Sequence, residues 1–95
     1  MRNNQTTIKE ALKLFLKKYH LEDKMNEGKV YQCWNNSMGP FVVNRTEKLK
    51  FHQGVLRVHM NSAPLRNELN MAKSLIIEKL NSELEEPLIK DLQLF

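Results

Sequence analysis

The chain has 95 residues, of which 41% are hydrophobic and 27% charged, with a formal net charge of +4 and a pI near 9.3. This composition is typical of one globular domain, and no apolar run approaches the roughly 20 residues of a membrane span. A secretory signal would need an apolar segment of about 7–15 residues, which is also missing, so we expect a cytoplasmic protein. The basic balance favours polyanionic partners, such as nucleic acid or an acidic protein.

The first predicted element is a helix over residues 7–19, TIKEALKLFLKKY, with Thr7 and Glu10 in a capping-box pattern. Apolar residues recur every three or four positions and form one stripe, which we expect to pack in the core: Ile8, Ala11, Leu12, Phe15, Leu16 and Tyr19. A neighbouring stripe of Lys9, Lys13 and Lys17 is a secondary basic surface. Because the core needs the apolar face, no membrane partner is expected.

A second helix is predicted over residues 21–38, where Gly39 and Pro40 end it. Tyr31 and Trp34 lie on its apolar side and are expected in the core. The following segment, FVVNRT, is either one short helical turn or a connection.

The stretch KLKFHQGVLRVHM, residues 48–60, predicts two strands joined by a two-residue turn at Gln53-Gly54. This turn sets apolar residues opposite each other and basic residues opposite each other, in the pairs Phe51 with Leu56, Leu49 with Val58, Lys50 with Arg57 and Lys48 with His59. A slip of one residue would destroy this agreement, which favours the hairpin and its register.

Lys50 opposite Arg57 is a like-charge pair, and such pairs destabilise a sheet by a few tenths of a kcal/mol. An anionic ligand lying across them would relieve the repulsion. We therefore predict a polyanion site formed by Lys48, Lys50, Arg57 and His59. The alternative is a solvated basic face that discourages aggregation at a sheet edge.

One long helix is predicted over residues 61–84, capped by Asn61 or Ser62 and with Pro64 in its first turn. Arg66 lies near its N-terminus, where helices favour anions, and could extend the polyanion site. The predicted core face is Leu65, Leu69, Ala72, Leu75, Ile76 and Leu80, while Asn81 falls on the solvent face. LIKDLQLF, residues 88–95, reads as a final strand.

The predicted fold class is α+β, with two N-terminal helices, a β-hairpin, a long helix and a C-terminal strand (ααββαβ). A strand–helix–strand crossover makes the last strand parallel to the second hairpin strand, which gives a three-stranded mixed sheet. Helices should cover one face of this sheet and leave the cationic face open.

Catalytic and metal-binding patterns are missing from the sequence. The three histidines do not have the spacing of metal ligands, and the single Cys33 has neither a disulfide partner nor an indicated base. We therefore expect no enzyme, no cofactor and no metal.

Several residues along the chain resemble, in order and spacing, the DciA-like family, long catalogued as a domain of unknown function: Trp34, Gly39, Thr46, Gly54, Leu56, Val58, Leu65, Glu68, Leu69 and Asn81. The chain is most similar to the short form of Bacteroidetes-type bacteria, as one domain over residues 1–95. The resemblance implies a K-homology-like fold and a non-enzymatic role in loading the replicative DnaB-type helicase onto DNA.

The implied partners are the replicative helicase and single-stranded or forked DNA, with RNA as an alternative, since some relatives are described as RNA-binding. The chain lacks the GxxG loop with which K-homology domains grip a nucleic-acid backbone. Nucleic-acid contact is therefore expected on the cationic sheet face. A different hypothesis is a protein-interaction module whose basic face docks on an acidic partner. The sequence does not indicate the oligomeric state.

Overall fold

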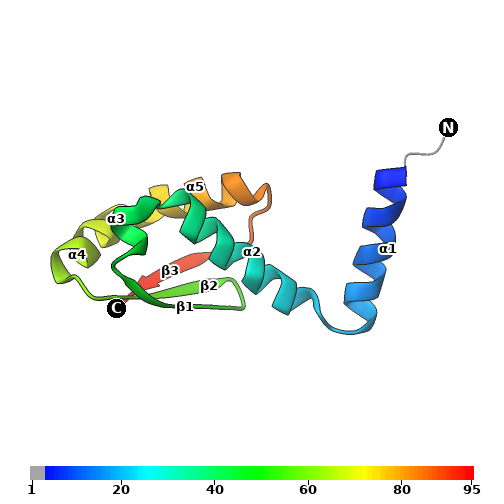
Figure 1. The fold of residues 1–95 in the computed structure, drawn as a ribbon, viewed down its shortest axis with the longest axis horizontal. Helices are drawn as coiled ribbons and strands as arrows, with labels where there is room; N and C mark the ends of the chain where they lie inside the picture. The colour runs from blue at the N-terminus through cyan, green and yellow to red at the C-terminus, as the bar shows by residue number, and fades with distance from the viewer. Residues whose placement is uncertain (1–3) are drawn as a thin grey trace.

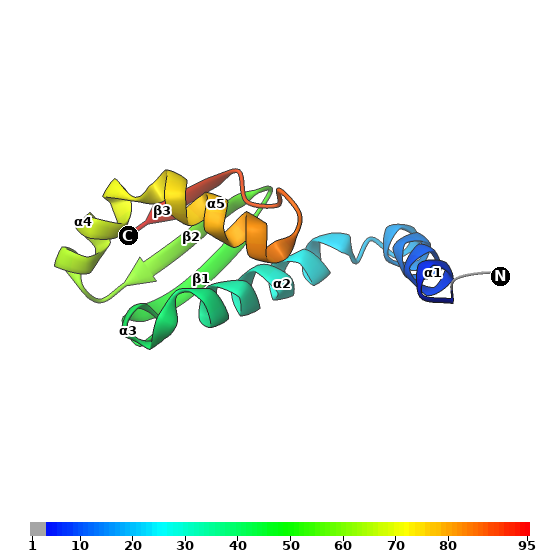
Figure 2. The ribbon, with the colours of Figure 1, turned by 90° about the horizontal axis from the view of Figure 1, so that it is seen from above.

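The computed structural model describes residues 4–95, with side chains described from Thr7 onward. Within this range the elements follow the order α1 (Asn4–Lys18), α2 (Glu22–Ser37), α3 (Gly39–Val43), β1 (Thr46–His52), β2 (Val55–Met60), α4 (Ala63–Met71), α5 (Lys73–Leu84) and β3 (Asp91–Leu94). The strands form one sheet in the order β1-β2-β3, and the helices after α1 lie over one of its faces (Figures 1 and 2). The predicted α+β class is confirmed.

The β1–β2 hairpin has the predicted register, with Phe51 opposite Leu56, Leu49 opposite Val58, Lys50 opposite Arg57 and Lys48 opposite His59. Gln53 and Gly54 both have positive φ, 49° and 83°, as a type I′ turn requires. A side chain at Gly54 would place its Cβ 3.0 Å from Lys90 Cδ. Glycine therefore serves both the turn and the close approach of the segment that leads into β3.

Strand β3 runs parallel to β2, as predicted, with Leu56 opposite Leu92 and Arg57 opposite Gln93. The backbone N–H groups of Lys90 and Asp91 both donate to the Gly54 carbonyl, at 2.7 and 3.2 Å. The start of β3 is thereby tied to the hairpin turn, which places β2 at the centre of a mixed three-stranded sheet.

Trp34 lies at the centre of the core and has no exposed surface. Its indole N–H donates to Thr46 Oγ1 at 3.2 Å, and the Thr46 hydroxyl donates in turn to the Val42 carbonyl at 2.9 Å. This relay satisfies the buried indole and connects α2, α3 and β1. On the same helix, the Tyr31 hydroxyl accepts a hydrogen bond from the Phe51 N–H at 3.0 Å, at the outer edge of β1.

The predicted long helix is broken into α4 and α5 at Ala72, whose φ of −111° and ψ of 18° leave the helical region. Ser62 caps α4 by accepting from the Leu65 N–H at 3.4 Å, and Pro64 lies in the first turn, as expected. The break rotates the helix that follows. Within α5, Leu80 is fully buried, but Leu75, predicted in the core, is 70% exposed, because the two positions lie about 140° apart around a helix.

Asn81, predicted on the solvent face, instead binds the backbone of Ile89. Its Nδ2 donates to the Ile89 carbonyl at 2.8 Å and its Oδ1 accepts from the Ile89 N–H at 2.9 Å. One side chain thus satisfies both polar groups of a buried residue that precedes β3. This clamp fixes where the chain returns from α5 to the sheet.

The burial predicted for the apolar stripe of the first helix is wrong. Helix α1 stands apart from the body, with which it makes no substantial contact (Figure 1). Leu16 is half-buried, whereas Ile8, Leu12, Phe15 and Tyr19 are exposed. The radius of gyration, 15.5 Å, accordingly exceeds the roughly 12 Å of a compact domain of this length. Helix α1 also begins before Thr7, which is therefore not at the cap.

The end of α1 is a Schellman motif in which a histidine takes the left-handed position. His20 has a φ of 56°, the Leu21 N–H donates to the Leu16 carbonyl at 2.8 Å, and the His20 N–H donates to the Lys17 carbonyl at 3.3 Å. Here the chain turns away before α2 begins. No helix among residues 4–95 combines the length and apolar character that a membrane crossing requires.

The orientation of α5 generates a prediction about two of its leucines. Leu80→Ala should lower the free energy of unfolding by about 2–5 kcal/mol, because it leaves a cavity in the core. Leu75→Ala, the same change on the exposed side of the same helix, should alter it by less than about 0.5 kcal/mol. Urea unfolding monitored by circular dichroism measures both. Equal losses for the two variants would contradict this orientation of α5.

Candidate nucleic-acid interface

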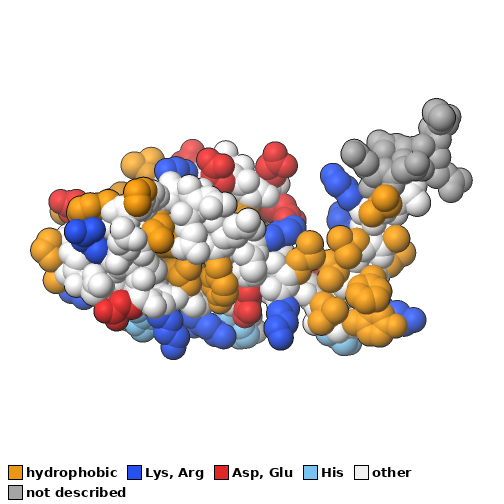
Figure 3. Space-filling model, viewed as in Figure 1, with side chains coloured by type: hydrophobic (Ala, Val, Ile, Leu, Met, Phe, Trp, Pro, Cys, Tyr) orange, Lys and Arg blue, Asp and Glu red, His pale blue; other side chains and the backbone are white. Residues whose placement is uncertain are grey.

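One face of the sheet is not covered by helices, and we call it the open face. Strand alternation places on it Lys48, Lys50, His52, Arg57, His59, Asp91, Gln93 and Phe95. The intervening residues Phe51, Leu56, Val58 and Leu92 are buried beneath the helices. Figure 3 shows lysine, arginine and histidine side chains gathered along this side of the body, below the sheet.

The structure brings four predicted site residues together on the open face. Lys48 faces His59 and Lys50 faces Arg57 across the hairpin, as the register requires. Side chains opposite each other in such a pair have Cβ atoms about 4.5–5.5 Å apart, so the like charges of Lys50 and Arg57 are close. Among the described residues, the one ion pair within 4.0 Å joins Lys29 to Glu86, away from this face. The cations of the open face therefore have no carboxylate partner at that distance.

Arg57 is held in place by a neighbour on β3. Its Nε donates to Gln93 Oε1 at 3.1 Å, and the two residues are also paired in the parallel register. This bond leaves the two terminal NH2 groups of the guanidinium out of the contact. A positioned guanidinium of this kind can donate two parallel hydrogen bonds to a phosphate.

The rings of His59 and Phe95 stack on each other beside Arg57. Their ring centroids are 4.9 Å apart and the ring planes differ by 21°. The Phe95 N–H donates to the Val58 carbonyl and the Met60 N–H donates to the Phe95 carbonyl, both at 2.9 Å. The sheet backbone on both sides of His59 thus fixes Phe95 beside it, and the open face carries aromatic as well as cationic groups.

Sequence reasoning missed Asp91, Gln93 and Phe95. The signal was present, because the parallel pairing was predicted, and alternation along β3 then puts these three residues beside β2. Asp91 pairs with Val55, at the opposite end of β3 from Phe95. The positive part of the open face therefore lies toward Lys48 and His59.

The remaining predicted basic residues lie elsewhere. Arg66 belongs to α4, which lies with the helices on the covered side of the sheet, so it is not part of the open face (Figure 2). Its predicted role in binding stays a prediction. Lys9, Lys13 and Lys17 are exposed on α1 and form a separate basic surface, away from the body.

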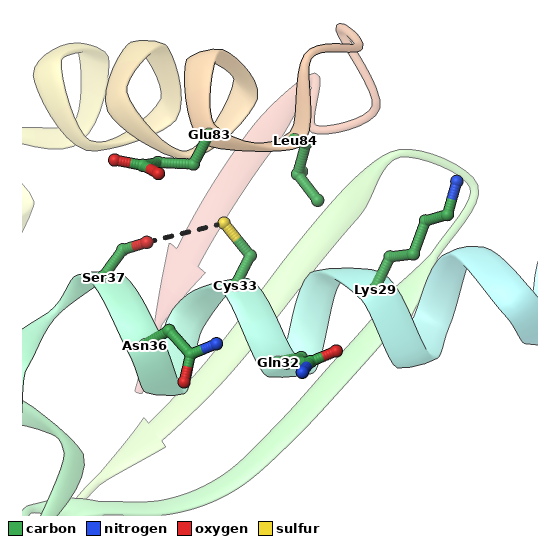
Figure 4. A pocket seen from close by; sticks show the side chains of 7 residues that line it. All are labelled: Lys29, Gln32, Cys33, Asn36, Ser37, Glu83 and Leu84. Atoms are coloured by element: carbon green, nitrogen blue, oxygen red, sulfur yellow. Dashed lines mark hydrogen bonds between the residues drawn. The ribbon is translucent and has the colours of Figure 1, made fainter.

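A shallow hollow of about 300 Å³ lies between α2 and α5 on the covered side (Figure 4). Glu83 and Leu84 border it from α5, and Cys33 and Ser37 from α2. The buried Cys33 thiol donates to the Leu80 carbonyl at 3.5 Å and lies 3.7 Å from Ser37 Oγ. This contact joins α2 to α5 and supports packing between the two helices.

The comparisons with known proteins give one result. The family model described as "Dna[CI] antecedent, DciA" matches residues 7–94, which includes most of α1 and all of the body except Phe95. No curated protein matches the chain. No solved structure matches it either, so the K-homology likeness stays a prediction.

The like-charge pairing generates a stability prediction. Lys50→Gln removes the charge that faces Arg57 and breaks no described ion pair. The free energy of unfolding at low salt should stay the same or rise by a few tenths of a kcal/mol. Lys29→Gln is the control, because it removes an equal charge together with the ion pair to Glu86 and should give no gain. A loss of about 1 kcal/mol in Lys50→Gln, measured by urea unfolding, would contradict the repulsion.

Proposed function

The chain belongs to the DciA family, and from this membership we propose that it is a non-enzymatic adaptor that binds nucleic acid and contacts the replicative helicase. The family is one of replication proteins associated with the DnaB helicase, and a helicase-loader role fits it. A helicase-loader role implies that the bound nucleic acid is DNA, in single-stranded or forked form. RNA is the alternative.

The observation that carries the nucleic-acid part is the basic set on the open face, in which Lys48, Lys50 and Arg57 gather beside His59 without a carboxylate within 4.0 Å among the described residues. The free protein bears the repulsion between facing cations. A phosphate chain lying across the two hairpin strands would convert it into attraction and release counterions from the nucleic acid. Lysine and arginine on an open sheet favour binding of a phosphate chain.

A second observation supports the protein contact. The apolar stripe of α1 is exposed, and exposed apolar patches of this kind usually mark interaction sites. Lys9, Lys13, Lys17 and Lys18 flank it, and Glu10 is the single acidic residue among residues 7–18. A second copy of α1 would bring these lysines together, so an apolar groove bordered by carboxylates fits better. We assign this groove to the helicase. The basic surface on α1 would then contact the helicase, and the open face would contact nucleic acid.

The nucleic-acid proposal is tested with the double variant Lys48→Gln/Lys50→Gln. Its affinity for a labelled single-stranded oligonucleotide should fall at low salt, because two phosphate contacts are lost. The slope of log affinity against log salt should flatten by about 1.4, from about 0.7 per neutralised phosphate on a single strand. Fluorescence anisotropy at several salt concentrations measures both quantities.

The matched control is Lys9→Gln/Lys13→Gln, which removes the same charge from α1. It should leave affinity and slope nearly unchanged. Loss of binding in this control alone would move the nucleic-acid site to α1. If the wild-type protein binds no nucleic acid, but the open-face variant loses the helicase, the basic face is instead a docking site for an acidic protein.

The helicase contact is tested with Leu12→Gln/Phe15→Gln on the exposed stripe. Glutamine keeps the helix propensity, and the melting temperature should not change because neither side chain is buried. Affinity for the purified helicase of the same organism, measured by biolayer interferometry, should fall about tenfold or more, as for the loss of central apolar anchors.

Leu14→Gln is the control for the α1 stripe, because Leu14 is 70% exposed on the opposite side of the helix and should not affect the helicase contact. Unchanged helicase affinity in the double variant would remove α1 from that contact. If light scattering shows that the wild-type protein is a dimer and the double variant a monomer, the stripe instead contacts a second copy of the chain.

A further inference from the structure

The stacked pair of His59 and Phe95 has no evident task in the fold itself. The core is complete without it, since both rings lie on the uncovered side of the sheet. We propose that this pair is a stacking platform for an unpaired base of single-stranded nucleic acid. The proposal rests on the proposed function of the open face and specifies which nucleic acid that face selects.

The geometry leaves one side of the platform available. His59 covers one face of the Phe95 ring, with near-parallel planes, yet 47% of the Phe95 surface is exposed. Phe95 follows β3, which is an edge strand, so no further strand of the described sheet lies beyond it. The ring face turned away from His59 therefore has no strand of the described sheet beside it. A base placed there would continue an existing stack rather than start a new one.

The cations lie across the platform from its free face, within reach of the backbone that carries a stacked base. Lys48 pairs with His59 across the hairpin, and Arg57 is bonded to Gln93, two residues before Phe95. Neighbouring strands are about 4.8 Å apart, so the lysines of β1 lie roughly 10 Å from β3. A strand whose base stacks on Phe95 can thus run its phosphates over Arg57 and toward β1.

This arrangement discriminates against duplexes. Bases within a duplex are already stacked on both faces and cannot lie on an aromatic side chain, whereas unpaired bases can, and they do so without sequence preference. Cations alone would attract either form. The aromatic pair is therefore the part of the open face that favours single strands, as a protein acting at a fork requires.

The test compares Phe95→Leu with the wild-type protein on three ligands of equal length: a single-stranded oligonucleotide, its duplex, and an abasic strand that keeps the phosphates. Affinity for the base-bearing strand should fall about tenfold, as for the loss of one stacked base. Affinity for the abasic strand and the salt slope should not change, because the cations remain. Phe95→Tyr should restore binding, and the melting temperatures should agree since the side chain is half exposed.

A second variant gives a direct signal. Trp34 is the single tryptophan of the chain and is fully buried, so Phe95→Trp adds one exposed indole to a constant background. Its fluorescence should be quenched by the base-bearing strand and not by the abasic strand at equal occupancy.

The outcomes separate this inference from the function on which it rests. If the wild-type protein binds none of the ligands, both proposals fail. A different outcome is that the wild-type protein binds with a salt-dependent affinity while Phe95→Leu binds each of the three ligands as tightly as the wild-type protein does. In that case the open face remains an interface and the platform is refuted. Equal weakening toward the base-bearing and abasic strands would also refute it, because the residue would then act on the structure of the face.

Discussion

The register of the β1–β2 hairpin is the constraint on which the rest of the molecule depends. Side chains alternate between the two faces of a strand, so a shift by one residue would put Lys50 and Arg57 into the core and Phe51 and Leu56 into solvent. The type I′ turn at Gln53-Gly54 sets this register, and the Gly54 carbonyl then receives the start of β3. One turn therefore positions the buried face, the cationic face and the third strand together.

The hairpin and the parallel strand could be predicted because their signals are local. Alternation has a strict period of two, and crossovers follow general rules, so the register and the mixed sheet could be derived from residues 48–60 and 88–95. The cationic half of the candidate site followed directly. Its aromatic half required the same alternation to be continued along β3 to Phe95.

Other features could not be read in this way. Met71, Ala72 and Lys73 are all good helix formers, so no glycine or proline announces the break between α4 and α5. The two hydrogen bonds of Asn81 depend on where Ile89 returns, which is a long-range property. For α1, periodicity indicates that a face will be covered, but not whether the covering surface belongs to the same chain. The general rule that an apolar stripe packs in its own core failed here for that reason.

The joint at His20 has a mechanical consequence. Helix α1 has 15 residues and is thus about 22 Å long, and it meets the body through the few residues around one left-handed position. A rotation of about 20° at this joint would move the far tip of the helix by about 8 Å, given that length. With such a rotation the helix would act as a lever arm, and a protein held along it could change its distance from a strand on the sheet while every contact within the body stays intact.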